Sequence, residues 1–189
     1  MDKFYIELYP KADLENEWTK NKHTPGAMPC MRCGGPMRES LAENALSRAL
    51  NVYVCPACGM DEALQAAQRL AIEYSNQALE QEHMLVALTQ QQDGLIPQLL
   101  TKMNVDPGTF ETAAAEKVSQ LPHVTGSGRD PDKVYISNEL DQALTAAEKQ
   151  AQQMKDEYIS VEHVFMGMLQ RPGRVAGELF KQFGITPEK

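Results

Sequence analysis

The chain has 189 residues, of which 42% are hydrophobic and 23% are charged, which is enough for one ordinary domain and a small additional module. No apolar run approaches the roughly 18 residues of a membrane span, and the start Met-Asp-Lys-Phe-Tyr-Ile-Glu is not a signal peptide, so we expect a cytoplasmic protein without a membrane partner. The net charge of -8 lies wholly in residues 61–189, which carry eleven Lys and Arg against nineteen Asp and Glu. Because phosphate contacts need a basic face, this part is a poor binder of nucleic acid.

Residues 1–28 are expected to form a loosely attached arm. Hydrophobic residues alternate near its start as in a short strand, but most of 13–23 is polar and Thr24-Pro25-Gly26 interrupts whatever precedes it. Trp18 is either an interaction anchor or a cover for the small core of the neighbouring module.

Two Cys-x-x-Cys pairs, each followed by glycine, predict a metal-binding module over residues 29–60. The pairs are Cys30 with Cys33 and Cys55 with Cys58, separated by 21 residues, a spacing that suits a zinc ribbon or a related treble-clef finger. Four thiolates complete a tetrahedral shell and leave no position for water, so the zinc ion is expected to be structural. The alternatives are a redox dithiol or local disulfides; a reducing compartment and the lack of a βαβ pattern make both less favoured. Between the pairs, residues 39–50 are interpreted as helix or loop and 51–54 as a strand.

From Asp61 onward the hydrophobic pattern has helical spacing, and the sequence repeats itself. Residues 61–107 align without a gap on 141–187, with eleven identities in 47 positions. Such a duplication means one supersecondary unit used twice, each copy supplying half of a shared core. The expected fold is therefore mainly α, with two pseudo-repeated four-helix units that form one helical domain, preceded by the zinc module.

The boundaries of the repeats follow from proline, glycine and capping signals. The first repeat is assigned to 61–120, the Gly- and Pro-rich linker to 121–133 and the second repeat to 134–189. The second repeat is expected to contain a helix over 138–154 and another that begins after an N-cap at Ser160. It stops where the first repeat starts its fourth helix, so it is expected to be truncated and to leave apolar surface uncovered near Phe180 and Phe183, which favours reduced stability or dimerisation.

Five segments of the helical part resemble the Clp N-terminal domain, the double four-helix repeat that precedes the ATPase rings of ClpA-, ClpB- and ClpC-type unfoldases. The segments are Glu62-Ala-Leu-Gln-Ala-Ala-Gln-Arg-Leu-Ala71, Glu80-Gln-Glu-His-Met-Leu85, Gly94-Leu-Ile-Pro-Gln-Leu-Leu100, Leu121-Pro-His-Val-Thr-Gly-Ser-Gly128 and Tyr158-Ile-Ser-Val-Glu-His163. The resemblance covers residues 62–189 and is nearest to ClpB-type disaggregases. Residues 28–64 resemble small zinc-ribbon proteins of bacterial and phage genomes, so the chain looks like a natural or engineered chimera whose parts meet at 61–64.

The Clp resemblance implies a recognition module with a hydrophobic groove that holds apolar segments of unfolded polypeptides or an adaptor protein. Carried over by position, the groove includes Leu140, Leu144 and Ala146, with Asp156 and Glu162 as polar positions for client handling. The alternative is that Leu140 and Leu144 are ordinary core residues.

Catalysis is not expected. The Glu-His pairs at 82–83 and 162–163 have no nucleophile placed beside them by a motif and no His-Glu-x-x-His pattern, and both occur at an expected helix start, where a structural role explains them. The 189 residues also contain no Gly-x-x-x-x-Gly-Lys-Ser/Thr phosphate loop.

Two functions from different classes remain. In the first, the chain is a client or adaptor-binding module without a motor, which competes with an intact Clp unfoldase for clients or partners. In the second, the zinc module contacts nucleic acid or a host protein and the helical domain is a passenger or a dimerisation unit. Residues 1–60 have no net charge, which makes nucleic-acid binding by the zinc module less favoured. Arg32, Arg38 and Arg48 nevertheless offer a local basic patch.

Overall fold

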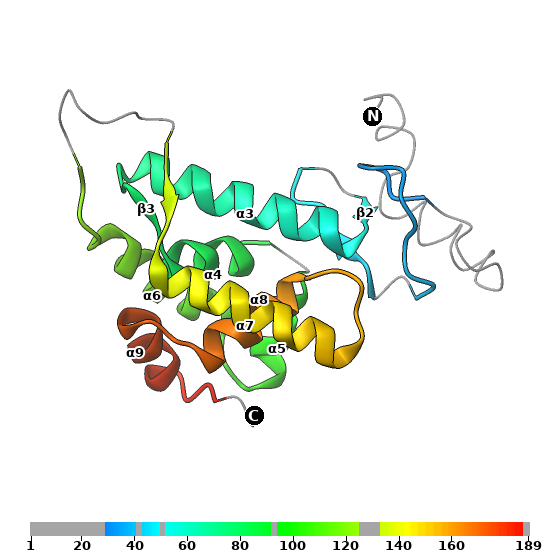
Figure 1. Ribbon diagram of the computed structural model, residues 1–189. Coiled ribbons are helices and arrows are strands. Elements are labelled where there is room, and N and C mark those ends of the chain that lie inside the picture. The colour runs from blue at the N-terminus through cyan, green and yellow to red at the C-terminus, as the bar shows by residue number, and fades with distance from the viewer. Residues whose placement is uncertain (1–28, 41–42, 50–51, 92–93, 125–132, 187–189) are drawn as a thin grey trace. The chain divides into compact units, whose positions relative to one another are not determined.

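The computed structural model describes residues 29–40, 43–49, 52–91, 94–124 and 133–186 (Figure 1). The arm expected over residues 1–28 therefore lies outside the described residues, as does most of the linker. The chain divides into two compact units, Met1–Glu62 and Ala63–Lys189.

The first unit contains a short hairpin and the start of a helix. Strand β1 (Ala45–Leu46) pairs antiparallel with β2 (Tyr53–Val54), with Ala45 opposite Val54. Helix α3 (Pro56–Glu73) follows at once, so the boundary between the units falls within this helix. The interpretation of 39–50 as helix or loop missed β1, because a strand of two residues has no periodicity of its own and is defined by its partner.

The second unit is helical, as expected (Figure 1). The first repeat contributes α4 (Gln81–Thr89), α5 (Leu95–Lys102) and α6 (Pro107–Ser119) after α3. The second contributes α7 (Asn138–Met154), α8 (Val161–Gln170) and α9 (Arg174–Gln182). A two-residue parallel pair, β3 (Ala78–Leu79) with β4 (Tyr135–Ile136), joins the repeats and was not predicted.

The helix boundaries follow from local capping chemistry. Asp106 is the N-cap of α6 and accepts a hydrogen bond from the backbone N–H of Thr109. Ser137 caps α7 by accepting from the N–H of Leu140. These side chains satisfy N–H groups that the first helical turn leaves without a backbone partner, which is why α7 begins at the predicted residue.

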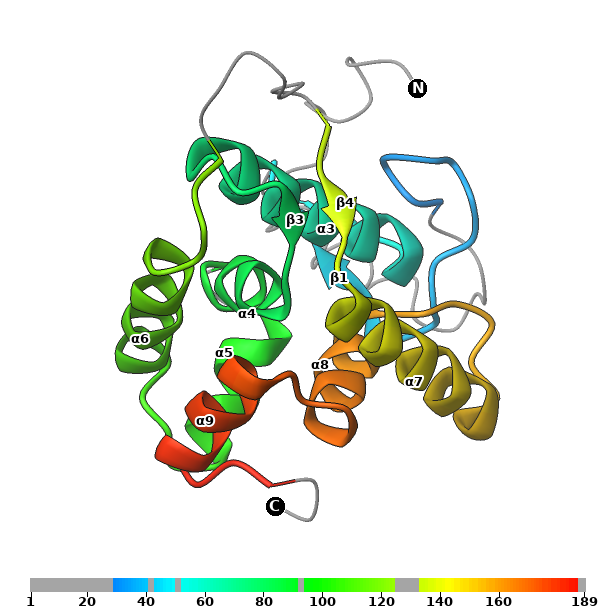
Figure 2. The same cartoon turned by 60° about the vertical axis from the view of Figure 1, so that its left-hand side comes forward.

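Aromatic rings from both repeats form part of the core of the second unit. The ring of Phe110 on α6 stacks on Phe180 with centroids 6.4 Å apart, and Phe165 on α8 contacts Phe180 at 5.9 Å. Phe180 is only 4% exposed. Phe183 is half-buried, with its ring centroid 5.2 Å from that of Phe110. The expectation of uncovered apolar surface is therefore wrong for Phe180, because α6 of the first repeat packs against α9 (Figure 2), whereas Phe183 stays partly exposed.

The described part of the chain contains no helix that is both long and apolar enough to span a bilayer.

Candidate functional site

The four cysteines converge in the first unit, as their spacing predicted. The sulfur atoms of Cys30, Cys33, Cys55 and Cys58 all lie within 4.8 Å of one another. The first pair sits on a tight turn in which the N–H of Gly34 donates to the carbonyl of Cys30. Gly34 has a φ of +71°, a left-handed conformation that glycine adopts without strain. This turn aims two thiols at one point.

The second pair is held by the start of α3. Cys55 immediately precedes the helix and Cys58 lies in its first turn, where the N–H of Gly59 donates to the carbonyl of Cys55. The first pair thus precedes the hairpin, and the second pair lies where the chain passes from the hairpin into α3. A helix N-terminus also favours negatively charged sulfur.

The donor set suits a soft metal ion. Without a cation, burial raises the pKa of Cys55 to about 11, and it also raises the pKa of Cys58. Burial acts in the same direction on Cys33, but the N–H of Gly35 and the neighbouring thiols outweigh it and lower that pKa. A bound divalent cation would compensate the cost of several buried thiolates, and a tetrahedral four-sulfur shell matches the preference of zinc.

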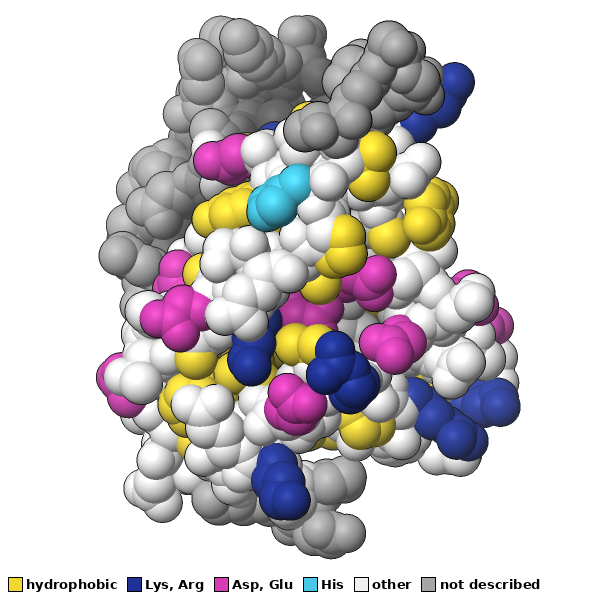
Figure 3. Space-filling model, turned by 90° about the vertical axis from the view of Figure 1, so that its left-hand side faces the viewer, with side chains coloured by type: hydrophobic (Ala, Val, Ile, Leu, Met, Phe, Trp, Pro, Cys, Tyr) yellow, Lys and Arg dark blue, Asp and Glu magenta, His cyan; other side chains and the backbone are white. Residues whose placement is uncertain are grey.

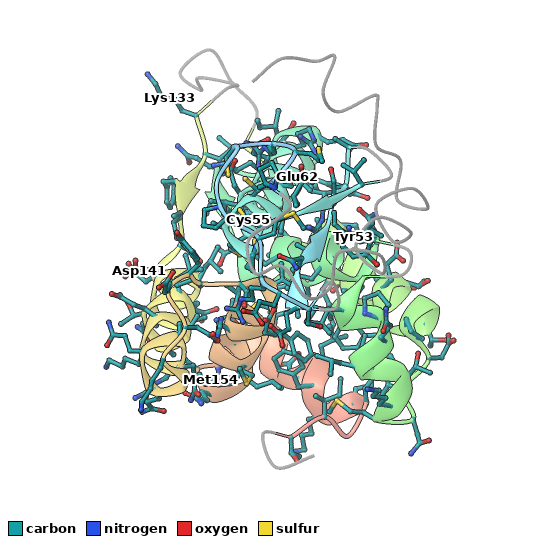
Figure 4. The ribbon with its side chains drawn as sticks, turned by 90° about the vertical axis from the view of Figure 1, so that its right-hand side faces the viewer. Tyr53, Cys55, Glu62, Lys133, Asp141 and Met154 are labelled. Atoms are coloured by element: carbon teal, nitrogen blue, oxygen red, sulfur yellow. The ribbon has the colours of Figure 1, made fainter. Side chains whose placement is uncertain are left out.

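A polar network surrounds the second pair and centres on Glu62, a residue that the sequence analysis did not single out. Glu62 is only 8% exposed. Its carboxylate accepts from the hydroxyl of Ser47 at 3.0 Å and from the backbone N–H of Arg48 at 2.6 Å. Arg32 donates to the carbonyl of Cys58 at 2.9 Å and forms an ion pair with Asp61. Figure 4 marks Cys55 beside the start of α3 and Glu62 within that helix. The network ties the hairpin loop to the helix that carries Cys58.

The predicted groove residues lie at different depths of the second unit. Leu140 is fully buried and Ala146 is 7% exposed, so these two belong to the core. Leu144, Asp156 and Glu162 are half-buried and reach the surface.

Two apolar side chains that the sequence analysis missed are exposed near these positions. Met154, at the end of α7, is 55% exposed, and Tyr158, in the connection to α8, is 43% exposed. Figure 4 marks Met154 and Asp141 toward opposite ends of α7. We use the name α7–α8 surface for the half-buried and exposed side chains of this region, which are Leu144, Met154, Asp156, Tyr158 and Glu162.

The two histidines of the Glu-His pairs are buried parts of helix caps. The Nδ1 atom of His83 accepts from the N–H of Glu80 at 3.0 Å, and its Nε2 atom lies 2.9 Å from the side-chain oxygen of Asn76. Burial lowers the pKa of His83 to about 4, which favours the neutral ring. These contacts support the structural interpretation of the first pair.

The second repeat places a serine, a histidine and an aspartate together. The hydroxyl of Ser160 lies 2.6 Å from Nδ1 of His163, whose Nε2 lies 3.1 Å from the carboxylate of Asp156. The same Nδ1 also accepts from the backbone N–H of Ser160, and the serine is 3% exposed. Ser160 and His163 are therefore buried parts of a helix cap, and the half-buried Asp156 contacts the histidine from the surface side.

Comparison with known proteins identifies the helical part. The sequence profile of the Clp repeat (R) N-terminal domain matches residues 59–183. The chain belongs to this family. Among its relatives, the chaperone protein ClpB of Nitratidesulfovibrio vulgaris is 36% identical over 129 residues, which are 68% of this chain and 15% of the relative. ClpB of Bdellovibrio bacteriovorus is 41% identical over 127 residues, which are 67% of this chain and 14% of the relative. The chain thus spans about one seventh of the length of these ClpB proteins.

Solved structures show the same Clp N-terminal fold. The Hsp104 N-terminal domain of Candida albicans superposes with a TM-score of 0.58 and 24% identity, covering 68% of this chain and 81% of that one. The N-domain of ClpV from Vibrio cholerae gives a TM-score of 0.57 at 19% identity, covering 70% of this chain and 79% of that one. The mainly α fold and the family resemblance seen in the sequence are confirmed.

Proposed function

We propose that the Clp N-terminal domain of this chain is a non-catalytic protein-binding module that takes exposed apolar segments of an unfolded polypeptide or an adaptor protein. The observation that carries the proposal is the α7–α8 surface, where Met154 and Tyr158, which flank Asp156 in the sequence, are 55% and 43% exposed. Exposed large apolar side chains next to polar groups favour protein contact. A flexible thioether and an aromatic ring also adapt to many partner sequences.

In this proposal, the partner contacts those predicted groove residues that are half-buried. Leu144 supplies half-buried apolar surface on α7, and Glu162 supplies a carboxylate in the first turn of α8. Leu140 and Ala146 support this surface from the core. A partner segment that covers Met154 and Tyr158 removes apolar area from water, which stabilises the complex by roughly 25 cal/mol for each Å² buried.

The four cysteines are proposed to hold one structural zinc ion. A closed shell of four thiolates leaves no open position for a substrate, so the ion contributes to folding. Arg32 and Arg48 are engaged beside this centre, the first with Cys58 and Asp61 and the second with the carbonyl of Gly59. Because two of the three arginines of the candidate basic patch have these partners, we do not extend the proposal to nucleic acid.

The protein-binding proposal is tested with a fluorescently labelled, permanently unfolded polypeptide and the full chain. The double substitution Met154→Ser with Tyr158→Ser should weaken binding about tenfold, because a loss near 1.4 kcal/mol is expected from two exposed apolar contacts. Leu95→Ser is the matched control, since Leu95 is 39% exposed on α5 and outside this surface. Equal binding by the double variant and the wild type would contradict the proposal, as would an equal loss in the control.

A further inference from the structure

The second unit also has a groove that shares no residue with the α7–α8 surface. Its volume is about 210 Å³, and it lies between the segment that contains β3, the segment that follows α6, and β4. The residues that line this groove include Ala78, Glu80, Leu121, Pro122, Val124 and Tyr135. The size matches one large side chain of a partner.

Hydrogen bonds between segments far apart in the sequence hold the groove in shape. The N–H of Val124 donates to the carbonyl of Ser75 at 3.0 Å, and the side-chain amide of Asn76 donates to the carbonyl of Pro122 at 3.1 Å. On the other wall, the N–H of Tyr135 donates to the carbonyl of Gln77 at 3.2 Å. A groove fixed in this way needs little ordering when a ligand enters, which lowers the entropic cost of binding.

Among the described residues that line the groove, Glu80 is the one that carries a charge. It is half-buried at the N-cap of α4, where it forms a capping box with His83. At the corresponding position of the second repeat, Ser160 caps α8 in the same way. Serine is among the preferred N-cap residues and glutamate is not, so capping alone does not account for a carboxylate here. No lysine or arginine within the described ranges forms an ion pair with it.

The remaining walls suit the stem of a long basic side chain. Leu121, Pro122 and Val124 provide apolar contact for methylene groups. The ring of Tyr135, which is 59% exposed, offers a face on which a planar cation stacks. Residues 61–189 as a whole carry eleven basic and nineteen acidic residues, so this part of the chain has a net negative charge. Figure 3 views the side on which the segment after α6 lies, and hydrophobic, acidic and basic side chains are interspersed there.

We propose that this groove is a docking site for an arginine side chain of an extended polypeptide segment. The guanidinium pairs with Glu80 and stacks on Tyr135, while the methylene stem lies along Pro122 and Val124. Arginine fits better than lysine because its planar head group both stacks and forms two hydrogen bonds to a carboxylate. The site does not depend on the function proposed for the α7–α8 surface.

The test is fluorescence anisotropy of the full chain with a labelled peptide of Gly, Ser and Pro that carries a single arginine. The comparison peptide has citrulline, which has nearly the same shape and no charge, in place of the arginine. The arginine peptide should bind about tenfold more tightly than the citrulline peptide, the effect of one desolvated cation contact near 1.4 kcal/mol. Equal affinity for the two peptides would overturn the proposal, and equal affinity for a lysine peptide would overturn the assignment to arginine.

Substitutions distinguish binding in the groove from a general attraction of the arginine peptide to surface carboxylates. Glu80→Ser places the capping residue of the second repeat at α4, so the fold is retained, and the preference for arginine should disappear; Glu80→Gln should give the same loss. Tyr135→Ala should weaken binding of the arginine peptide. Glu148→Ser removes an exposed carboxylate from α7 and should leave binding unchanged. Retention of the arginine preference by Glu80→Ser, with thermal unfolding like that of the wild type, would also overturn the proposal.

Discussion

The side-chain carboxylate of Glu82 is almost wholly removed from water. It lies in the first turn of α4 and is 3% exposed. Burial raises its pKa from 4.5 to about 7, and the neighbouring carboxylates of Glu80 and Glu139 act in the same direction. The folded state therefore retains a proton over a pH range in which the unfolded chain has lost it. The contribution of Glu82 to stability is greatest below pH 4.5, decreases as pH rises, and reaches its lowest value above about pH 7.

The substitution Glu82→Gln should remove this pH dependence. At pH 8 we expect the variant to exceed the wild type by up to about 3 kcal/mol in the free energy of unfolding, because no charge is then buried. At pH 4.5 the two proteins should be nearly equal. Thermal unfolding between pH 4.5 and 8 measures the difference, and a variant that is less stable at pH 8 would show that the carboxylate is stabilised by contacts that outweigh its burial.

The first turn of helix α3 depends on the four-cysteine centre. Cys58 lies in its first turn, and Glu62, one turn further on, accepts hydrogen bonds from the hairpin loop. We expect chelation, or Cys58→Ser, to remove one zinc ion per chain and to abolish amide protection over residues 52–62, because apparent zinc-binding free energies of about 10 kcal/mol or more are folding free energy in such small modules.

Metal analysis and hydrogen exchange by mass spectrometry check this expectation. The helices α7 and α8 serve as the internal control and should keep their protection. A protein that holds no metal and still protects residues 52–62 would contradict it. A truncation to 61–189 would not be a clean control, since it removes the first five residues of α3.

Helices α7 and α8 pack closely against each other at a glycine of α8. A Cβ atom on Gly167 of α8 would lie 2.3 Å from the carbonyl oxygen of Ala143 and 2.9 Å from the backbone nitrogen of Ala147, both on α7. Neither backbone atom can move without shifting the helix. Gly167→Ala should therefore destabilise the protein by about 1–3 kcal/mol, the usual cost of overpacking a core.

A matched control for this substitution lies in the first turn of α6. A Cβ atom on Gly108 would have Asp106 Oδ1 as its nearest neighbour at 3.6 Å, an ordinary contact. Gly108→Ala should be neutral or slightly stabilising, because alanine favours helix. Urea unfolding compares the two variants, and equal stability would mean that α7 and α8 separate at little cost.

At the scale of the whole helical unit, Gln81 links the two repeats. Its side-chain amide donates to the carbonyls of Glu139 and Arg171 at 2.8 and 2.9 Å, and its oxygen accepts from the N–H of Gly173 at 3.0 Å. The residue is 1% exposed. All the backbone groups that it satisfies belong to the second repeat.

Gln81→Ala should leave these backbone groups buried without a partner and cost on the order of 3 kcal/mol. Gln90→Ala, at the exposed C-terminal end of the same helix, should change stability by no more than about 0.5 kcal/mol. Denaturant unfolding of both variants measures the effect. A loss in Gln81→Ala no larger than in Gln90→Ala would show that other contacts hold the repeats together.

The sequence by itself determined the features that depend on local chemistry. The helix over 138–154 was predicted from the helical spacing of apolar residues, and the convergence of the cysteines was predicted from the two Cys-x-x-Cys pairs. The internal repeat at a spacing of 80 residues and the Clp segments predicted the family from the sequence alone.

Only the tertiary structure decided the features made by segments far apart in the chain. The β3–β4 pair, the burial of Phe180 beneath α6, the bridge made by Gln81 and the groove at Glu80 each need two or more such segments. A hydrophobic pattern shows which residues prefer burial, but not which partner covers them. Long-range packing selects that partner, and here it placed Leu140 in the core and left Met154 and Tyr158 at the surface.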